Sequence, residues 1–407
     1  MASLAISEEA ARRFLLDHLW LGSGRPPEST VIDLVQHLEA VQIDPVARVG
    51  RNQDLVLMTR NTRYQPTWLD DALMRGDVFE YRAQEASVLP MKDYPLLKGV
   101  RQRMRERLQD ELDRYADIVQ EIVARIEAEG PLMARDFASD HRVLGYWDTD
   151  QAQTKATSHV LNLLYDAGYL VIASRQGVIR RFDIPHRRVP RATLEEAEAI
   201  DVEDADRRLF EKYFRAYGLV NASSPRLGWS YRPMRWRRAW IQEQEAQGKI
   251  LRVDIKNVKR PYYVLEAYRD RLIHWENAER GWNRPIRFLP PLDNLLWDRD
   301  RLSDLFSFYY RWEVYVPAHR RTFGVYAMPV LAGDRLIGRI DPELHRRTHT
   351  LRLHKIEFEP GIRVTPRLKD AVADALCRFG DRLGAHQLAW DPSLDADDSH
   401  PENPDQQ

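Results

Sequence analysis

Cysteine is nearly absent from this sequence, because Cys377 is the only one among 407 residues. An internal disulfide needs two cysteines and a Cys-rich zinc or iron–sulfur site needs several, so neither can form. The chain also lacks an apolar run near the roughly 20 residues of a membrane-spanning helix, and its first residues lack a signal-peptide pattern. We therefore expect a soluble protein of the cytoplasm with no membrane partner.

An excess of charge of one sign is also missing. The 61 lysines and arginines balance 62 aspartates and glutamates, which gives a net charge of −1. This balance argues against a protein that coats nucleic acid by bulk charge. Arginine greatly outnumbers lysine, however, and the planar guanidinium group suits bidentate contacts with phosphate. Since a biased genome composition also enriches arginine, composition permits DNA binding without demonstrating it.

The clearest architectural pattern lies between residues 116 and 192. The expected elements are helices at 118–129, 132–138 and 151–167, followed by strands at 169–172 and 178–182. Three helices followed by a two-stranded hairpin are typical of a winged-helix unit, whose third helix suits the major groove of DNA. A weaker copy of the pattern follows, with helices ending near 217 and 247 and strands at 250–253 and 262–265.

The two ends of the chain complete this plan. Near the N-terminus we expect helices at 7–19 and 30–38, and near the C-terminus strands at 311–316, 322–331, 335–341 and 350–358 and a helix at 366–383. The sequence thus predicts an α+β fold, with tandem winged-helix (helix-turn-helix) domains followed by a C-terminal antiparallel β-barrel. The expected units are residues 1–115, 116–192, 193–280 and 281–388, with a disordered tail at 389–407.

Two polar residues in a short extended run are the strongest candidates for chemistry. Pro45 drives Asp44 away from helical angles, and residues i and i+2 of an extended segment point the same way. Gln42 and Asp44 therefore share a face while Ile43 is buried on the other. An amide and a carboxylate so placed can orient one water and accept its proton, as hydrolysis of a glycosidic bond requires. Alternatively, Asp44 and Pro45 only initiate a turn.

Further residues are candidates for contacts with DNA. Tyr81 and Arg82 lie in an alternating aromatic and charged run, read either as a pocket wall or as a half-buried strand. Arg48 and Arg51 follow the Gln42–Asp44 run and suit phosphates, although each is also compatible with an ordinary surface position. The other candidates are Arg235 and Arg237 beside Trp236, read otherwise as a solvated helix face, and His319, Arg320 and Arg321 in an expected loop between strands.

Four blocks of sequence, in this order, resemble the winged-helix DNA glycosylases of the YcaQ/AlkZ superfamily. They are AVQIDPVAR followed by NQDL (residues 40–48 and 52–55), FEYRAQEASVLP (79–90), LPPLDNLLWDR (289–299) and YRWEVYVP (310–317). The likeness extends over about residues 7–385. One departure is that the family pattern after the tyrosine is Trp-Ala-His-Glu, where this chain has Arg82 and Gln84 as the corresponding substrate-side residues.

The resemblance implies a monofunctional DNA glycosylase that removes N-alkylated purines of the N7-alkylguanine type, including interstrand crosslinks, in base excision repair. It implies no cofactor and no metal, and double-stranded DNA as the partner of a monomer associated with the nucleoid. Gln42 would position the water, and Asp44 would activate it or stabilise the oxocarbenium ion, in the aspartate branch of the family. The family's basic barrel hairpin corresponds to His319, Arg320 and Arg321.

Two other classes of function remain open from the sequence. A non-enzymatic winged-helix DNA-binding protein or transcriptional regulator would share the fold and the arginine-rich surfaces, but would have no use for Gln42 beside Asp44. A nuclease would need clustered carboxylates around a metal. The acidic run at 293–300 fails the spacing of a calcium-binding loop, because Leu295, Leu296 and Trp297 occupy positions that should be polar.

Overall fold

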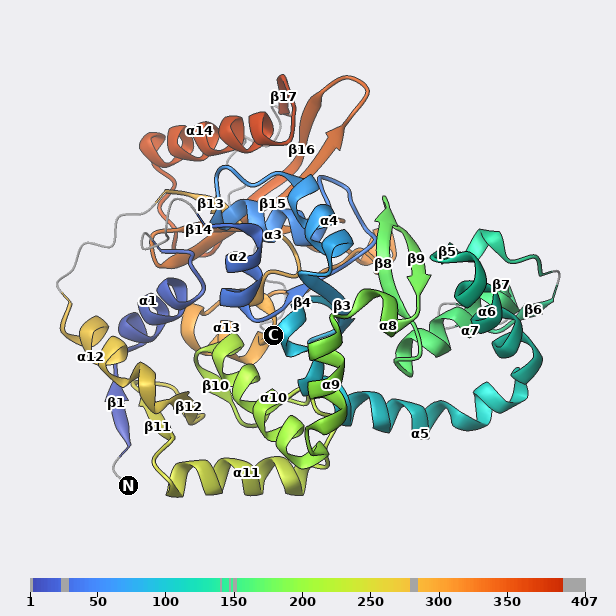
Figure 1. Cartoon of the computed structure of the whole chain (residues 1–407). Helices are drawn as coiled ribbons and strands as arrows, with labels where there is room; N and C mark the ends of the chain where they lie inside the picture. The colour runs from blue at the N-terminus through green and yellow to red at the C-terminus, as the bar shows by residue number, and fades with distance from the viewer. Residues whose placement is uncertain are drawn as a thin grey trace, which may run out of the picture.

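A computed structural model describes residues 3–22, 29–139, 141–145, 148, 152–278 and 285–390 of the chain. Helices and short sheets alternate along the chain, and Figure 1 shows the C-terminal sheet with α14 at the top of the molecule and α11 at its lower edge. Among the described residues, no helix is long and apolar enough to cross a membrane.

The first part of the chain places a small sheet among four helices. Its elements are α1 (Glu8–His18), α2 (Val31–Leu38), β2 (Val41–Gln42), α3 (Asn52–Arg60), α4 (Pro66–Arg75), β3 (Val78–Arg82) and β4 (Ala86–Pro90). The strands form an antiparallel sheet in the order β2-β4-β3. The expected helix starts are confirmed, since Ser7 caps α1 and Thr30 with Asp33 forms a capping box at α2.

A long helical stretch leads into the second part. The elements are η1 (Met91–Leu97), α5 (Lys98–Arg114), α6 (Ala116–Glu129), β5 (Leu132–Met133), η2 (Ala134–Asp136), β6 (Arg142–Val143), β7 (Thr154–Lys155), α7 (Ala156–Asp166), β8 (Val171–Gln176) and β9 (Ile179–Asp183). The hairpin of β8 and β9 forms as expected, and β5 adds to β9. The helix expected at 132–138 is wrong: β5 and a single 3-10 turn occupy this stretch. The helix expected at 151–167 begins only at Ala156, after β7.

The third part repeats the order of helix, strand, helix and hairpin. The elements are α8 (Pro185–Arg188), α9 (Arg191–Ala199), α10 (Val202–Tyr217), β10 (Val220–Asn221), α11 (Met234–Ala246), β11 (Ile250–Ile255), β12 (Tyr262–Leu265), η3 (Glu266–Tyr268) and α12 (Arg269–Asn277). The N-terminal strand β1 (Leu4–Ile6) joins this sheet by pairing in parallel with β11. The first residues of the chain therefore lie beside residues 253–255.

The C-terminal part is a curled five-stranded sheet with one covering helix. Its elements are β13 (Arg287–Phe288), η4 (Asn294–Leu296), α13 (Arg299–Phe306), η5 (Ala318–Arg320), β14 (Met328–Ala332), β15 (Arg335–His345), β16 (Thr350–Phe358), α14 (Pro366–Arg382) and β17 (Gln387–Trp390). The strands β15 and β16 and the closing helix begin where the sequence predicts them.

Several expectations for this part are wrong. No strand forms at 311–316, and the strand expected at 322–331 begins only at Met328. The sheet is not wholly antiparallel, because β17 pairs in parallel with β16, and its described order, β13-β14-β15-β16-β17, is open. Ala389 and Trp390 belong to β17 and not to a disordered tail. The rest of that tail lies outside the described residues.

A fully buried ion pair joins the first and last parts of the chain. Arg60 at the end of α3 donates two hydrogen bonds to Asp293, at 2.7 and 3.0 Å, and neither side chain is exposed. The guanidinium group also donates to the carbonyl oxygens of Leu19 and Val56. Asp293 in turn accepts the backbone N–H of Leu295 and so caps η4. Both charged groups of this pair are thus compensated by hydrogen bonds. A buried charge would otherwise be strongly destabilising.

Replacing Asp293→Ala should therefore destabilise the protein strongly. The variant leaves the Arg60 charge buried without its partner and removes the cap of η4, which together cost about 3–5 kcal/mol of the free energy of unfolding. Urea unfolding monitored by circular dichroism measures the loss. As a control, Glu195→Ala breaks an exposed ion pair with Arg191 and should leave the unfolding midpoint unchanged.

Candidate functional site

The strand that carries Gln42 is held on one edge of a sheet. Val41 pairs with Val88 and Gln42 with Ser87, and the N–H of Ile43 donates to the carbonyl oxygen of Ala86 at 2.8 Å. The extended conformation thus continues past the end of β2, as the sequence predicts. It ends at Asp44, where the chain turns.

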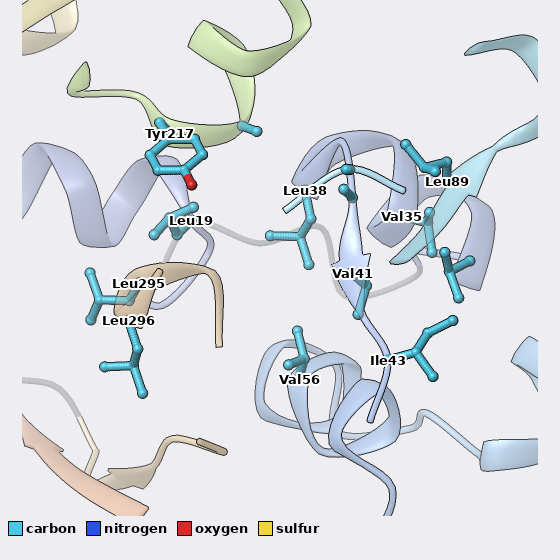
Figure 2. Packing of buried hydrophobic residues seen from close by; sticks show 14 of the residues in the cluster. Leu19, Val35, Leu38, Val41, Ile43, Val56, Leu89, Tyr217, Leu295 and Leu296 are labelled. Atoms are coloured by element: carbon cyan, nitrogen blue, oxygen red, sulfur yellow. The ribbon is translucent and has the colours of Figure 1, made fainter. Parts of the chain in front are cut away.

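Apolar side chains of this segment fix it in the core. Val41 is fully buried and Ile43 is 8% exposed. Figure 2 shows Val41 between Leu38 of α2 and Val56 of α3, with Ile43 beside it. Asp44 is partly exposed, whereas Gln42 is buried, with 8% of its surface accessible. Val41 and Ile43 are buried as expected, but Gln42 is as buried as Ile43, so burial does not alternate here, and Asp44 is the more accessible member of the polar pair.

Two buried asparagines hold the backbone of this segment. The Asn52 amide donates to the carbonyl oxygen of Gln42 at 2.9 Å, and its own oxygen accepts the N–H of Leu292 at 3.1 Å. The Asn294 amide donates to the carbonyl oxygen of Ala40 at 2.9 Å. Residues 292–294 of the C-terminal part thereby fix the backbone on which Gln42 stands. Sequence reasoning missed both asparagines, although both lie in blocks that carry the family resemblance.

Asp44 forms a turn and retains the electrostatics of a reactive carboxylate. Its Oδ1 accepts the N–H of Val46 at 2.8 Å, so the alternative of a turn-initiating aspartate is correct as a description of the backbone. Burial raises the pKa of Asp44, and the hydrogen bond from Val46 opposes this effect only in part. Within the described residues no Lys, Arg or His forms an ion pair with it. The carboxylate is therefore available for a cation or a proton from outside the protein.

An aromatic residue that the sequence analysis did not single out lies near this carboxylate. Burial of its ring, and to a smaller extent the Asp44 charge, raises the pKa of Tyr326. Partial desolvation and the same Asp44 charge raise the pKa of Tyr315, although 66% of that residue is exposed. The Trp312 ring stands edge-on to both tyrosines, at 6.2 and 6.1 Å between centroids. The segment 312–326 therefore brings an exposed aromatic ring to the candidate site.

Two buried carboxylates order this segment. Glu313 accepts the N–H groups of Thr322 and Phe323, at 2.9 and 2.7 Å, and Asp341 accepts those of Val325 and Tyr326. Gly324 has φ +110°, and a Cβ atom there would lie 2.3 Å from Asp341 Oδ2. The close approach of this loop to β15 therefore requires glycine.

The basic residues after the Gln42–Asp44 run are engaged within the protein. Arg48 lies 3.1 Å from the Glu343 carboxylate. Arg51 donates to Asp54 and to Asp70, and these hydrogen bonds raise the pKa of its guanidinium above the usual value in spite of burial. Arg48 keeps 24% of its side chain exposed at the edge of the site, while Arg51 is bound at the start of α3.

The residues around Tyr81 join the first part of the chain to the later ones. Tyr81 is buried and its hydroxyl donates to the carbonyl oxygen of Asp166 at 2.6 Å, while Arg82 forms a bidentate pair with the Asp166 carboxylate. The Gln84 side chain accepts a hydrogen bond from Tyr217 at 2.6 Å. These contacts correspond to the half-buried strand that the sequence left open as the alternative to a pocket wall.

The arginine-rich helix start lies on α11. Arg235 is exposed, while Arg237 is half-buried and donates to the carbonyl oxygen of Pro225 at 3.0 Å. Trp236 packs edge-on against Phe210, with 5.3 Å between ring centroids, and donates to Glu203. Within the described chain, no hydrogen bond or ion pair links these arginines to Gln42 or Asp44, so the structure does not bring them together.

The basic triplet occupies a different local structure from the expected hairpin loop. His319 and Arg320 are exposed in the 3-10 turn η5, and Arg321 donates to the carbonyl oxygen of Val316 at 2.7 Å. The expectation of a loop between two strands is wrong, because no strand precedes it. The triplet follows Tyr315 in the same segment of the chain, 312–326.

Metal ligation finds no support in the arrangement of side chains. Among the described residues, no three His, Cys, Asp or Glu side chains lie together in a group that could hold a metal ion. The acidic run at 293–300 has structural tasks instead. Asp293 pairs with Arg60, and Asp298 caps α13 through the N–H of Arg301.

Two comparisons with known proteins bear on this site. The family model described as DNA glycosylase AlkZ-like matches residues 35–382, a span that includes the Gln42–Asp44 run and the segment 292–294. The solved structure of the Streptomyces sahachiroi DNA glycosylase AlkZ superposes with a TM-score of 0.59 at 16% sequence identity. The match covers 95% of this chain and 100% of that one.

The raised pKa of Asp44 makes a prediction about stability. A carboxyl whose pKa is higher in the folded than in the unfolded state loses stability as pH rises through the folded value. Asp44→Asn is neutral at every pH and keeps an oxygen for the Val46 N–H. It should therefore be at least as stable as wild type at pH 7, with a smaller advantage at pH 4. Thermal unfolding at both pH values tests this, and a clear loss of stability at pH 7 would show that Asp44 is a structural residue.

Proposed function

The chain belongs to the AlkZ-like family of DNA glycosylases, and from this premise we propose that it hydrolyses the N-glycosidic bond of N-alkylated purines in DNA, with Gln42 and Asp44 as the catalytic pair. The observation that carries the proposal is the partly buried Asp44 carboxylate, which has a raised pKa and no ion-pair partner in the described chain. We further expect it to act as a monomer on nucleoid DNA, without a cofactor.

The reaction requires activation of a water molecule and stabilisation of positive charge, and this pair is suited to both. Water attacks C1′ of the sugar as the bond from C1′ to the base nitrogen breaks, and the bonding electrons leave with the base. The Asp44 carboxylate accepts the proton of the water and stabilises the positive charge that develops on the sugar, while the Gln42 amide orients the water. A carboxylate already neutralised by an arginine would do both less well.

The proposed reaction uses no general acid to protonate the departing base, and this suggests the substrate class. Alkylation of N7 makes the purine cationic, so the departing base becomes neutral by taking the bonding electrons and needs no proton. One carboxylate then suffices. The same charge on the base is attracted to Asp44 in a partly desolvated site, where Coulomb interactions are stronger than in water.

The proposal extends to bulky lesions such as interstrand crosslinks. A base joined to the opposite strand cannot be extruded into an enclosed pocket. Asp44 is partly exposed, so its carboxylate could be reached by a lesion that stays within the duplex. A complex with lesion DNA in which a tight pocket closes around the base would contradict this part.

Excision of 7-methylguanine from a duplex tests the proposed function. We expect wild type to leave an abasic site that hot alkali converts into a strand break. Asp44→Asn should lower the single-turnover rate by about 100-fold or more, since the proton acceptor is lost, and Gln42→Ala should lower it by about tenfold. Strand cleavage on a gel measures both rates.

Matched controls are available on α5. Asp110 and Gln109 are exposed there, and Asp110→Asn and Gln109→Ala should leave the rate unchanged. If neither the wild type nor any variant yields a strand break, although all of them bind DNA, the chain would be a DNA-binding protein without glycosylase activity. A crosslinked duplex should then be tried once before that conclusion is drawn.

The pH dependence of excision should identify the carboxylate. Activity requires ionised Asp44, so the rate should fall as the pH drops through its pKa, which burial places above the ordinary value of 3.8. Single-turnover rates from pH 4 to 8, corrected for spontaneous depurination, measure this acid limb. A residual activity of Asp44→Asn with the same limb would assign the titration to another group.

A further inference from the structure

The hairpin of β15 and β16 carries an unusual concentration of positive charge. Between Glu343 and Glu357 the chain has three arginines, one lysine and three histidines, and no acidic residue. Residues 345–349 form the exposed end of the hairpin, and Arg352 and His354 are exposed on β16. In Figure 1 this orange hairpin lies at the upper edge of the molecule. Sequence analysis did not single it out.

The register of the strands sorts these side chains onto one face. Glu343 lies opposite Arg352, and His345 lies opposite Thr350. Directly paired residues share a face, as do residues two apart on one strand, so His345, Arg352 and His354 surround Glu343. The alternate residues Leu351 and Leu353 are buried on the other face, which packs into the core. The apolar face therefore accounts for folding, and the basic face is not needed for it.

Direct contacts tie this face to the candidate site. The N–H of Leu344 donates to the carbonyl oxygen of Arg48 at 3.1 Å, and the Arg346 guanidinium donates to the carbonyl oxygen of Val49 at 3.3 Å. Arg48 itself reaches Glu343, which also lies 2.7 Å from His354. The basic face thus adjoins the segment that follows Asp44 directly in the chain. One acidic side chain, Glu343, stands among its cations.

We propose that the outer face of the β15–β16 hairpin, with His345, Arg347, Arg352 and His354, and the adjoining Arg48 bind the phosphate backbone of duplex DNA beside the proposed catalytic pair. This inference rests on the proposed function, since it takes DNA as the partner. Exposed guanidinium groups on a rigid hairpin supply contacts that position a duplex without reading its sequence. Arg347 and Arg352, which are both exposed and have no ion pair in the described chain, contribute most.

The test measures binding of an undamaged duplex at several salt concentrations. Each phosphate contact contributes about 0.9 to the slope of log affinity against log salt concentration. The double variant Arg347→Ala/Arg352→Ala should therefore lower that slope by about 2 and weaken binding about tenfold at moderate salt. Its thermal unfolding midpoint should match that of wild type. A wild-type affinity and slope would overturn the proposal.

A matched control separates this surface from the effect of net charge. Arg191→Ala/Arg208→Ala removes the same two charges from α9 and α10, where both residues are exposed. It should leave affinity and slope unchanged. An equal loss in this control would contradict the proposal, because any surface arginine would then serve. Binding of undamaged DNA needs no excision, so failure of the glycosylase assay would leave this result standing.

Glu343 provides a test in the opposite direction. Glu343→Gln removes the one carboxylate among these cations and frees Arg48 and His354 for phosphate. We expect severalfold tighter DNA binding, in spite of the loss of the three ion pairs that Glu343 forms with Arg48, His345 and His354. Weaker binding by this variant would mean that the basic residues serve only to hold Glu343, and the proposal would fail.

Discussion

The site depends on the buried ion pair of Arg60 and Asp293, which joins two segments that lie far apart in the sequence. We call this pair, with its surrounding hydrogen bonds, the joint. Neither side chain is exposed, and each is matched by further hydrogen bonds to the backbone. This joint holds the segment 292–294 against α3, and from there Asn52 and Asn294 fix the carbonyl oxygens of Gln42 and Ala40. The position of β2, which carries Gln42, is thus set by the C-terminal part of the chain. A motif read in isolation gives no hint of this dependence.

The electrostatics of Asp44 contrast with those of the carboxylates around it. Asp54, Asp166, Asp293 and Glu343 each face an arginine, whereas Asp44 accepts only the N–H of Val46 within the described chain. Burial without a cation raises its pKa and leaves its charge uncompensated. Such an arrangement costs stability unless something outside the chain completes it. A cationic base or an oxocarbenium ion at the sugar would do so, which is why the same feature supports catalysis.

Periodicity and local signals predicted much of the fold. The capping box at Thr30, the hairpin of β8 and β9, and the strand at 350–358 follow from residues close together in sequence. The strand expected at 311–316 was wrong because its alternating pattern serves a loop that Glu313 orders through distant N–H groups. The roles of Asn52 and Asn294, and the placing of Tyr315 and of the β15–β16 hairpin by the site, depend on tertiary contacts that no local pattern encodes. The Gln42–Asp44 pair is a prediction that spacing and resemblance made together.

The contacts around Arg60 and Asp293 should affect excision by fixing the position of Gln42. A double-mutant cycle tests this most directly. Single-turnover excision rates would be measured for wild type, Asn52→Ala, Gln42→Ala and the double variant. We predict that Asn52→Ala slows wild type substantially but adds little to Gln42→Ala, because Asn52 holds the backbone on which Gln42 stands. Equal slowing in both backgrounds would contradict the account, since Asn52 would then act on the whole fold and not through β2.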